Sequence, residues 1–214
     1  MCGRFFIAEE GEDALLTRMI EEAARRQKAI VGEGEIARGE VFPSCTAAAL
    51  AVGRSGQVGA FPMQWGFHRS DGGLIINTRS ETALDRPMFR SSMLQRRCLI
   101  PASWYFEWEQ KSDPPAPGER AKAVEKREPQ RVKYLIRSAA PGPIYLAGIY
   151  RYEEGRKLPV FSILTREPAP EIAFIHNRMP VIFSEHTRGL WLDGNADPQS
   201  ALRACEQAMA YRPA

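Results

Sequence analysis

Cysteine and histidine are both scarce in this chain, which narrows the chemistry that it can carry. Its 214 residues include 4 cysteines and 3 histidines. The cysteines stand far apart and no two form a CxxC pair, so neither a zinc site nor a disulfide framework is indicated. His68, His176 and His186 are too few for a histidine-rich metal centre. We therefore expect no metal, no cofactor and a reducing, cytoplasmic setting.

Long apolar runs and a strong excess of one charge are also missing. No uninterrupted apolar stretch is long enough to span a bilayer. The N-terminus has no basic segment followed by an apolar one, as a secretory signal would have. The net charge is only +3, so any contact with nucleic acid must come from a local cluster of arginines. These absences predict a protein without a membrane partner.

Strand-like and helix-like patterns follow one another along the chain without an internal repeat. We expect strands at 3–8, 46–52, 57–67 (interrupted by Pro62), 74–76, 98–101, 134–136, 144–152, 159–164 and 181–183. We expect helices over 12–28, 81–97, 165–175, 184–191 and 197–210. Many strands with few strict strand–helix–strand units predict a single α+β domain over 1–214. The segment 111–132, rich in proline and charge, predicts an exposed loop.

Cys2 follows the initiator Met directly, and this is an unusual place for a thiol. Removal of Met1 would leave Cys2 with an α-amine and a thiol on adjacent carbons. Their pKa values of about 7.7–8.0 and about 8.5 make both partly nucleophilic near neutral pH. Such a 1,2-aminothiol condenses with an aldehyde to a Schiff base and then closes a thiazolidine ring. The alternative is a chance residue on a frayed terminus, although the β-prone run at 3–8 favours an anchored one.

Three further polar side chains stand where a purely structural pattern would place apolar ones. Asn77 follows a buried strand, Glu107 lies inside an aromatic run, and His176 follows an expected helix. Each has a structural alternative, which is a turn residue for Asn77, a solvent-facing side chain for Glu107 and a capping or core residue for His176. Strand alternation would place Glu107 on one face with Tyr105 and Glu109. If Glu107 is buried, its pKa should rise and favour general acid–base catalysis.

Four segments, in their order and spacing, resemble the SOS-response-associated peptidase (SRAP) family, which includes the animal embryonic-stem-cell 5-hydroxymethylcytosine-binding protein. The segments are MCGRF at the start, INTRSET at 76–82, RCLIPASWYFEW at 97–108 and IHNRMPVI at 175–182, with YLAGIY at 145–150 between the last two. The resemblance spans nearly the whole chain. It implies a twisted antiparallel, barrel-like sheet core flanked by helices.

The resemblance implies a monomeric DNA-damage shield that crosslinks to abasic sites in single-stranded DNA or at single-strand/double-strand junctions. Cys2 would trap the ring-opened aldehyde as a thiazolidine, and Asn77 would orient Cys2. Glu107 would serve as acid and base in ring opening and reversal, and His176 would donate to the opened sugar. The resemblance also implies limited self-cleavage ahead of Cys2, and a nucleoid location when the protein is bound to DNA.

The resemblance further implies a set of DNA contacts around these four residues. Arginines at family positions would clamp phosphates, Met88 would act as a wedge, and a proline would line the rim. The set is Arg4, Arg79, Arg86, Arg178, Met88 and Pro43. Pro43 matches a family position, although the residues before it differ. Trp65 and Phe67 in QWGF are candidates for stacking on bases, with a place in the core as the alternative.

Other functions remain open for a chain that begins in this way. Glutamine amidotransferase domains also begin Met-Cys-Gly, and there the thiol attacks a carboxamide with the α-amine as base. That N-terminal-nucleophile hydrolase would not be expected to match the three later segments. A cysteine peptidase would pair Cys2 with His176 and use Asn77 as the orienting group. In a non-catalytic binder of single-stranded DNA, Cys2 would be dispensable.

Overall fold

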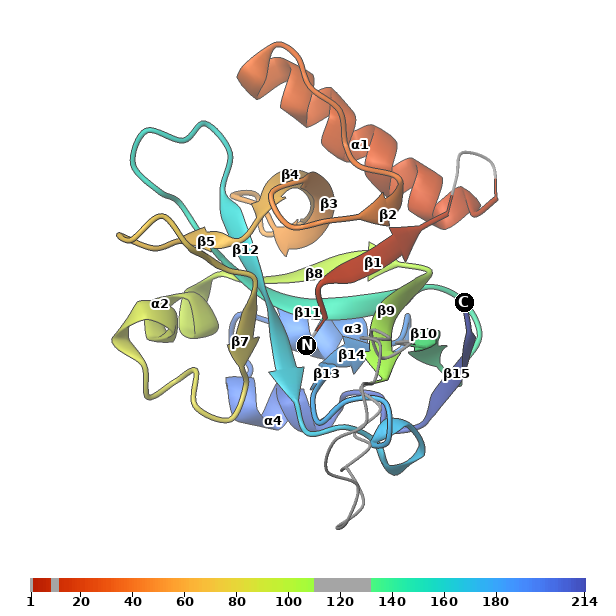
Figure 1. Ribbon diagram of the computed structural model, residues 1–214. Coiled ribbons are helices and arrows are strands. Elements are labelled where there is room, and N and C mark those ends of the chain that lie inside the picture. The colour runs from red at the N-terminus through yellow and green to blue at the C-terminus, as the bar shows by residue number, and fades with distance from the viewer. Residues whose placement is uncertain (1, 9–11, 110–131) are drawn as a thin grey trace, which may run out of the picture.

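Two twisted, mainly antiparallel sheets form the body of the fold, and helices surround them (Figure 1). The computed structural model describes residues 2–8, 12–109 and 132–214. The arrangement confirms the expected α+β class, since strands dominate the described chain and the helices lie at the edges of the sheets. None of the described helices is long and apolar enough to cross a bilayer.

The five-stranded sheet brings the N-terminus beside the aromatic segment. Its strands, in spatial order, are β15 (Met209–Pro213), β10 (Val132–Ser138), β9 (Trp104–Glu109), β1 (Arg4–Ile7) and β2 (Gly39–Val41). All neighbours in this sheet are antiparallel. Arg4 of β1 lies opposite Phe106 of β9. This register carries Cys2, two residues before Arg4, toward Glu107 of the neighbouring strand.

The eight-stranded sheet closes on itself. Its strands, in order, are β13 (Met179–Pro180), β12 (Val160–Arg166), β4 (Val58–Trp65), β3 (Thr46–Val52), β8 (Arg97–Ala102), β11 (Ile144–Arg151) and β14 (Ile182–Phe183), with β7 (Asn77–Arg79) beside β12. Because β12 also pairs with β11, strands β12, β4, β3, β8 and β11 form a closed circuit. This circuit agrees with the barrel-like core expected from the family resemblance. The remaining strands, β5 (Phe67–His68) and β6 (Leu74–Ile75), form a separate ribbon.

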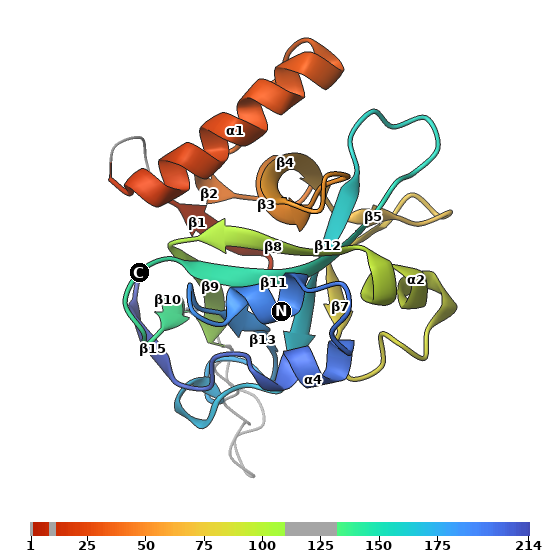
Figure 2. The same cartoon turned by 180° about the vertical axis from the view of Figure 1, so that it is seen from behind.

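The helices cover different sides of the sheets. They are α1 (Ala14–Val31), α2 (Pro87–Gln95), α3 (Arg188–Leu192) and α4 (Pro198–Arg203), with a short 3₁₀ turn η1 (Pro170–Ile172). Asp13 caps the start of α1 by accepting hydrogen bonds from two backbone N–H groups, and Gly32, with φ 91°, caps its end. Helix α1 packs along β3 and β4. Helix α3 contacts β8, and Figure 2 shows the blue C-terminal helices below β8 and β11, on the other side of these strands from α1.

Several element boundaries differ from those expected from the sequence. The strand at 58–65 is continuous through Pro62, because β12 pairs with β4 only at Gln64 and Trp65 and requires no N–H from Pro62. The expected helix over 197–210 ends at Arg203, and the chain then forms strand β15. The expected helix over 165–175 is reduced to the 3₁₀ turn, and the one over 81–97 begins only at Pro87.

Two further expectations concern the loop at 111–132 and residue 77. The expected loop lies outside the described residues, except for Val132, which begins β10. Asn77 lies in a short strand that pairs with β12, with Asn77 opposite Ile163. The turn alternative for Asn77 is therefore wrong, because a neighbouring strand supplies the backbone partners of this segment.

Trp65 and Phe67 belong to the core. Both side chains are 0% exposed. The Trp65 ring packs against Phe5 with centroids 5.1 Å apart, and its Nε1 donates to the Ile76 carbonyl at 2.9 Å. The chain turns at Gly66 (φ 117°) between β4 and β5, and both rings stay inside. The expectation that these two aromatics stack on bases is therefore wrong, since stacking needs an exposed ring face.

Candidate functional site

Cys2 is anchored inside the protein just before β1. Its side chain is 0% exposed. The Nδ2 group of Asn77 donates a hydrogen bond to the Cys2 carbonyl at 2.8 Å, and the Cys2 thiol lies 3.7 Å from the Arg4 carbonyl. The frayed-terminus alternative for Cys2 is therefore wrong, because β7 holds this residue from the side.

The environment of Cys2 keeps its thiol protonated. Burial raises the pKa of the Cys2 thiol well above its ordinary value, and the negative charge of Glu107 raises it further. The sequence alone suggested a thiol that is partly ionised near neutral pH, and the structure corrects this. A protonated thiol needs a neighbouring base to accept its proton as it attacks.

Glu107 is buried beside Cys2. Its side chain is 6% exposed, so the solvent-facing alternative is wrong. Three consecutive side chains of β9, Tyr105 to Glu107, are buried. Strand alternation therefore does not divide this segment into a buried face and a solvent-exposed face. The Glu107 charge raises the pKa of the Cys2 thiol and also acts on His176. A carboxylate in this position is suited to move protons between these groups.

His176 follows the 3₁₀ turn and is half-buried. The backbone N–H of Arg178 donates to His176 Nδ1 at 3.0 Å. Burial lowers the pKa of His176, and the Glu107 charge opposes this only in part. The ring is therefore neutral near pH 7, and because Nδ1 is the acceptor, the proton lies on Nε2. His176 can donate one hydrogen bond from Nε2.

Asn77 and Tyr105 each hold a buried polar atom that accepts or donates no hydrogen bond within the described part of the chain. These atoms are Asn77 Oδ1 and the Tyr105 hydroxyl. Burial raises the pKa of Tyr105, and the neighbouring Cys2 and Glu107 charges raise it further. Buried polar atoms of this kind usually have a partner, so both are suited to meet a ligand. Tyr105 was missed from the sequence, although alternation placed it on the face of Glu107.

Arg4 and Lys133 converge on one carboxylate at the edge of the site. Glu40 of β2 lies 3.2 Å from Arg4 Nη1 and 2.8 Å from Lys133 Nζ. The Arg4 guanidinium also lies 5.0 Å from the Trp108 ring centroid, and Lys133 lies 3.8 Å from that of Phe106. The hydrogen bond from Lys133 lowers the pKa of Glu40. Lys133 is on a distant strand, and no local motif marked it as part of this group.

Arg178 has a mainly structural environment. Its guanidinium forms two hydrogen bonds to Glu81, each 2.8 Å long, and a third to the Thr165 carbonyl at 2.7 Å. Its side chain is only 12% exposed. Although burial raises the pKa of Glu81, the hydrogen bonds from Arg178 lower it below its ordinary value. These contacts occupy the guanidinium N–H groups with which Arg178 would bind a phosphate.

The other expected DNA contacts lie on the surface. Arg79 ends β7, two residues after Asn77, and is exposed. Arg86 is exposed directly before α2, and Met88 in the first turn of that helix is 48% exposed. Neither arginine forms an ion pair with another described residue. Pro43 follows β2 and is half-buried. Among the described residues, the arginines near β7 and α2 therefore have no carboxylate partner, whereas Arg4 and Lys133 beside β1 are paired with Glu40.

No group of three or more His, Cys, Asp or Glu side chains in 2–8, 12–109 and 132–214 is arranged to hold a metal ion. The side chains that the described site does offer are a thiol, a carboxylate, a neutral imidazole and an amide. This set can add a nucleophile to a carbonyl group and move the protons that the addition requires.

The family model described as "SOS response associated peptidase (SRAP)" matches residues 1–213. The chain is 28% identical over 215 residues to the abasic site processing protein YoqW of Bacillus subtilis, covering 92% of this chain and 83% of that protein. It is 28% identical over 221 residues to the abasic site processing protein YedK of Escherichia coli, covering 99% and 90%. A third relative, the abasic site processing protein HMCES of Rattus norvegicus, is 27% identical over 178 residues, covering 67% and 48%.

Solved structures share the fold. A protein from Bacteroides thetaiotaomicron aligns with a TM-score of 0.70 and 19% identity, covering 99% of this chain and 91% of that one. A phage-related protein from Bordetella bronchiseptica aligns with a TM-score of 0.68 and 19% identity, covering 100% and 94%. At this identity the likeness concerns the fold alone.

Proposed function

The chain belongs to the SOS response associated peptidase (SRAP) family, and we propose that it processes abasic sites in DNA by bonding Cys2 covalently to the ring-opened sugar. Its relatives YoqW and YedK carry the name abasic site processing protein. The observation that best supports the proposal is that Asn77, Glu107 and His176 all act on or near Cys2. Asn77 holds the Cys2 carbonyl at 2.8 Å, and the Glu107 charge acts on both Cys2 and His176.

The proposed reaction joins an amine, a thiol and an aldehyde. Removal of Met1 frees the α-amine of Cys2. The amine adds to C1 of the open deoxyribose, and loss of one water gives a Schiff base. The thiol sulfur then adds to the same carbon, and the thiol proton ends on the nitrogen, which closes a five-membered thiazolidine. One water leaves in all, and no oxidant or reductant is needed.

Each neighbour of Cys2 has a role in this scheme that follows from its environment. Glu107 takes the proton of the neutral Cys2 thiol and returns it to nitrogen. His176 donates from Nε2 to the sugar ring oxygen as the closed hemiacetal opens, because its Nδ1 already accepts from the backbone. Asn77 orients Cys2 through its amide N–H groups, while Oδ1 remains to accept a hydrogen bond from the freed amine. Reversal follows the same steps backward.

We propose single-stranded DNA as the partner, held by surface cations around Cys2. Arg79 and Arg86 are exposed and free of carboxylate partners among the described side chains, which suits phosphate contacts. Met88 projects at the start of α2 and can wedge between bases. Arg4 reaches phosphate once Glu40 releases it. Arg178 supports the fold of this face through Glu81.

The test is adduct formation with a single-stranded oligonucleotide that contains one abasic site, measured on a denaturing gel. We expect a heat-stable adduct with the native chain and none with Cys2→Ala, whose noncovalent DNA binding should persist. Cys2→Ser keeps the amine and loses the thiol, so it should form only a Schiff base that borohydride traps. An adduct of unchanged yield and stability with Cys2→Ala would exclude the thiazolidine.

Two features argue against a peptidase that acts on other proteins. A cysteine peptidase needs a thiol whose pKa is lowered by an adjacent imidazole, whereas the pKa of the Cys2 thiol is raised by burial. His176 Nδ1 accepts from the Arg178 backbone, and the Cys2 thiol faces the Arg4 carbonyl. We expect no turnover of a casein substrate, with self-removal of residues ahead of Cys2 as the only peptide cleavage.

A further inference from the structure

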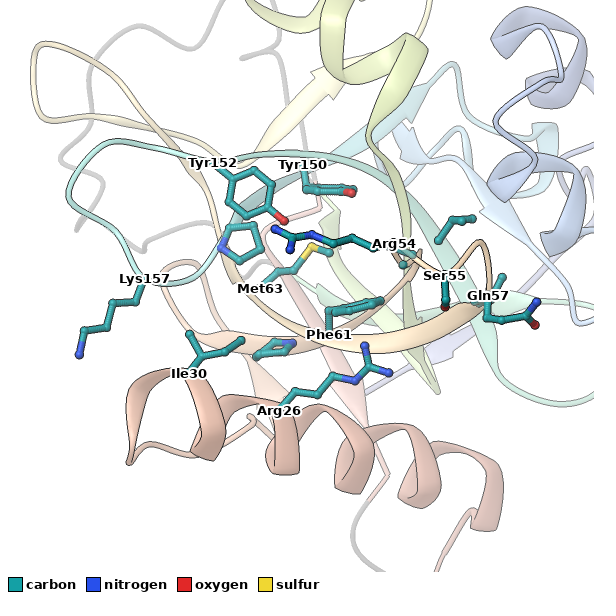
Figure 3. Close-up of a pocket in the computed structure, with 16 residues that line it drawn as sticks. Arg26, Ile30, Arg54, Ser55, Gln57, Phe61, Met63, Tyr150, Tyr152 and Lys157 are labelled. Atoms are coloured by element: carbon teal, nitrogen blue, oxygen red, sulfur yellow. The ribbon is translucent and has the colours of Figure 1, made fainter.

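A second concave site lies between α1, the β3–β4 hairpin and the connection from β11 to β12 (Figure 3). Its volume of about 500 Å³ falls in the range of roughly 300–1,000 Å³ that is usual for binding pockets. The pocket is lined by 16 residues, and none of them belongs to the candidate site around Cys2. It can therefore bind a ligand while the Cys2 site is occupied.

The pocket is basic. Arg26, Arg54 and Lys157 line it, and no aspartate or glutamate does. Figure 3 shows Arg54 reaching into the pocket below Tyr152, while Lys157 extends outward at the rim. Neither Arg54 nor Lys157 forms an ion pair with any residue that the structure describes. Two unpaired cations in one concavity favour an anionic ligand.

Arg26 is held in place as part of the wall. It pairs with Glu22 at 2.5 Å, and its guanidinium lies 4.1 Å from the centroid of the Phe61 ring. A Cβ at Gly59 would come within 2.8 Å of Arg26 Nη2, so a larger residue there would push the guanidinium out of this position. The wall is thus prearranged, which lowers the entropic cost of binding.

The lining is also strongly apolar, and part of it is exposed. Ile30 is 49% exposed, Val52 40% and Val58 50%, while Tyr152 at the rim is 68% exposed. Aliphatic surface of this extent gains from covering by apolar groups. A nucleotide could cover part of it with its base, but its hydrated sugar would leave the aliphatic side chains at the rim uncovered, whereas the side chains of a peptide can cover them. These features favour a peptide over a nucleic acid.

We infer that this pocket binds a short peptide segment of a partner protein, in which an apolar side chain is flanked by aspartates or glutamates. The apolar side chain would fill the space between Phe61, Met63 and Tyr150. The flanking carboxylates would pair with Arg54 and Lys157. Because the two sites share no residue, such a segment recruits the protein to a partner without competing for DNA.

The test is selection of peptides from a random display library on the immobilised protein, followed by fluorescence anisotropy of the selected peptides. We expect enriched sequences to carry Asp or Glu next to Leu, Ile or Phe. The variant Arg54→Glu/Lys157→Glu should weaken their binding by at least about tenfold, with stronger salt dependence in the native chain. Both side chains are exposed, so the variant should fold. Arg18→Glu, exposed on α1 and outside the pocket, is the matched control and should bind normally.

Three results would overturn this inference. One is a selection that enriches no acidic peptides. Another is binding that Arg54→Glu/Lys157→Glu and Arg18→Glu weaken equally. The third is a labelled oligothymidylate, used with Cys2→Ala, that loses affinity when the pocket charges are reversed while the peptides do not, which would make this surface a nucleic-acid contact instead. Adduct formation at Cys2 is measured separately and does not depend on any of these outcomes.

Discussion

Cys2 combines a buried, protonated thiol with a neighbouring carboxylate, and this combination determines how it can react. Burial and the Glu107 charge both raise the pKa of the thiol. A thiol of this kind resists general alkylation and oxidation, which act on the thiolate. In the reaction that we propose, the thiol attacks only when an aldehyde is already bound and Glu107 accepts the thiol proton. This requirement would make Cys2 selective for a docked aldehyde.

Replacing Glu107 separates its effect on the pKa of the Cys2 thiol from its proposed role as the acid–base group. In Glu107→Gln the charge that raises the pKa of Cys2 is removed, so the thiol ionises more readily and iodoacetamide should label it faster. Loss of the acid–base group should at the same time slow crosslinking by about 10²–10⁴-fold. Labelling is followed by mass spectrometry and crosslinking on denaturing gels. Equal slowing of both reactions would indicate that Glu107 only supports the local structure.

Replacing Asn77 tests the orientation of Cys2. Asn77→Ala removes the hydrogen bond to the Cys2 carbonyl, worth about 1–2 kcal/mol, so crosslinking should slow by roughly tenfold. Ser80→Ala is a matched control, because Ser80 also donates to a backbone carbonyl from the same segment, at Thr165, and lies outside the site. If both variants crosslink at the native rate, Asn77 does not position Cys2.

At the scale of elements, one ionic contact at the edge of the site reaches from β2 across β1 and β9 to β10. Glu40 of β2 binds Arg4 of β1 and Lys133 of β10, and the two cations also cover aromatic rings of β9. The carboxylate holds both cations at the edge of the sheet. It also neutralises part of the charge that would otherwise attract phosphate.

Removing the negative charge of Glu40 should strengthen DNA binding. In Glu40→Gln, both cations lose their partner, and affinity for undamaged single-stranded DNA should rise roughly two- to tenfold with a steeper salt dependence. Fluorescence anisotropy across a salt series measures both quantities. Glu35→Gln, which removes an exposed charge shortly before β2, is the control and should change affinity little. Unchanged binding in Glu40→Gln would exclude Arg4 and Lys133 from the DNA contact.

Elements with strong local patterns were predictable, and those that depend on distant partners were not. The strand at Thr46–Val52 was expected within its observed bounds, because a short apolar run that ends at the glycine turn of Gly53 and Gly56 is typical of a strand. Strand β15 was missed, because Met209–Pro213 is extended only through pairing with β10. Asn77 likewise reads as a turn residue until β12 is placed beside it.

The same limit applies to the site. Cys2, Asn77, Glu107 and His176 stood out because polar residues interrupted apolar segments and matched family motifs. The raised pKa of Cys2 was not predictable, since it comes from burial by segments far along the chain. Lys133 was missed for the same reason, because its partner Glu40 is distant in sequence.

At the scale of the whole molecule, the buried thiols couple stability to alkaline pH. Burial raises the pKa of Cys98 as well as that of Cys2. Above about pH 8.5 the unfolded thiols lose their protons while the folded ones keep them, so stability falls as pH rises. Each thiol should contribute a slope of about 1.4 kcal/mol per pH unit. Urea unfolding of the native chain and Cys98→Ala between about pH 8 and 10 measures this, and equal slopes would contradict it.

The two proposed sites would have separate roles. We propose that the face around Cys2 binds DNA and that the basic, apolar pocket beside α1 binds an acidic peptide segment. Because the two share no residue, a variant in either site should leave binding at the other unchanged.

The central claim is that Cys2 forms a thiazolidine with an abasic-site aldehyde, and the most direct measurement is mass spectrometry of the digested adduct. The account predicts an N-terminal peptide that begins at Cys2, lacks Met1 and carries the sugar with loss of one water. It also predicts that borohydride leaves this mass unchanged, because the ring has no C=N bond to reduce. A sugar attached to a lysine, or to a chain that retains Met1, would contradict the claim.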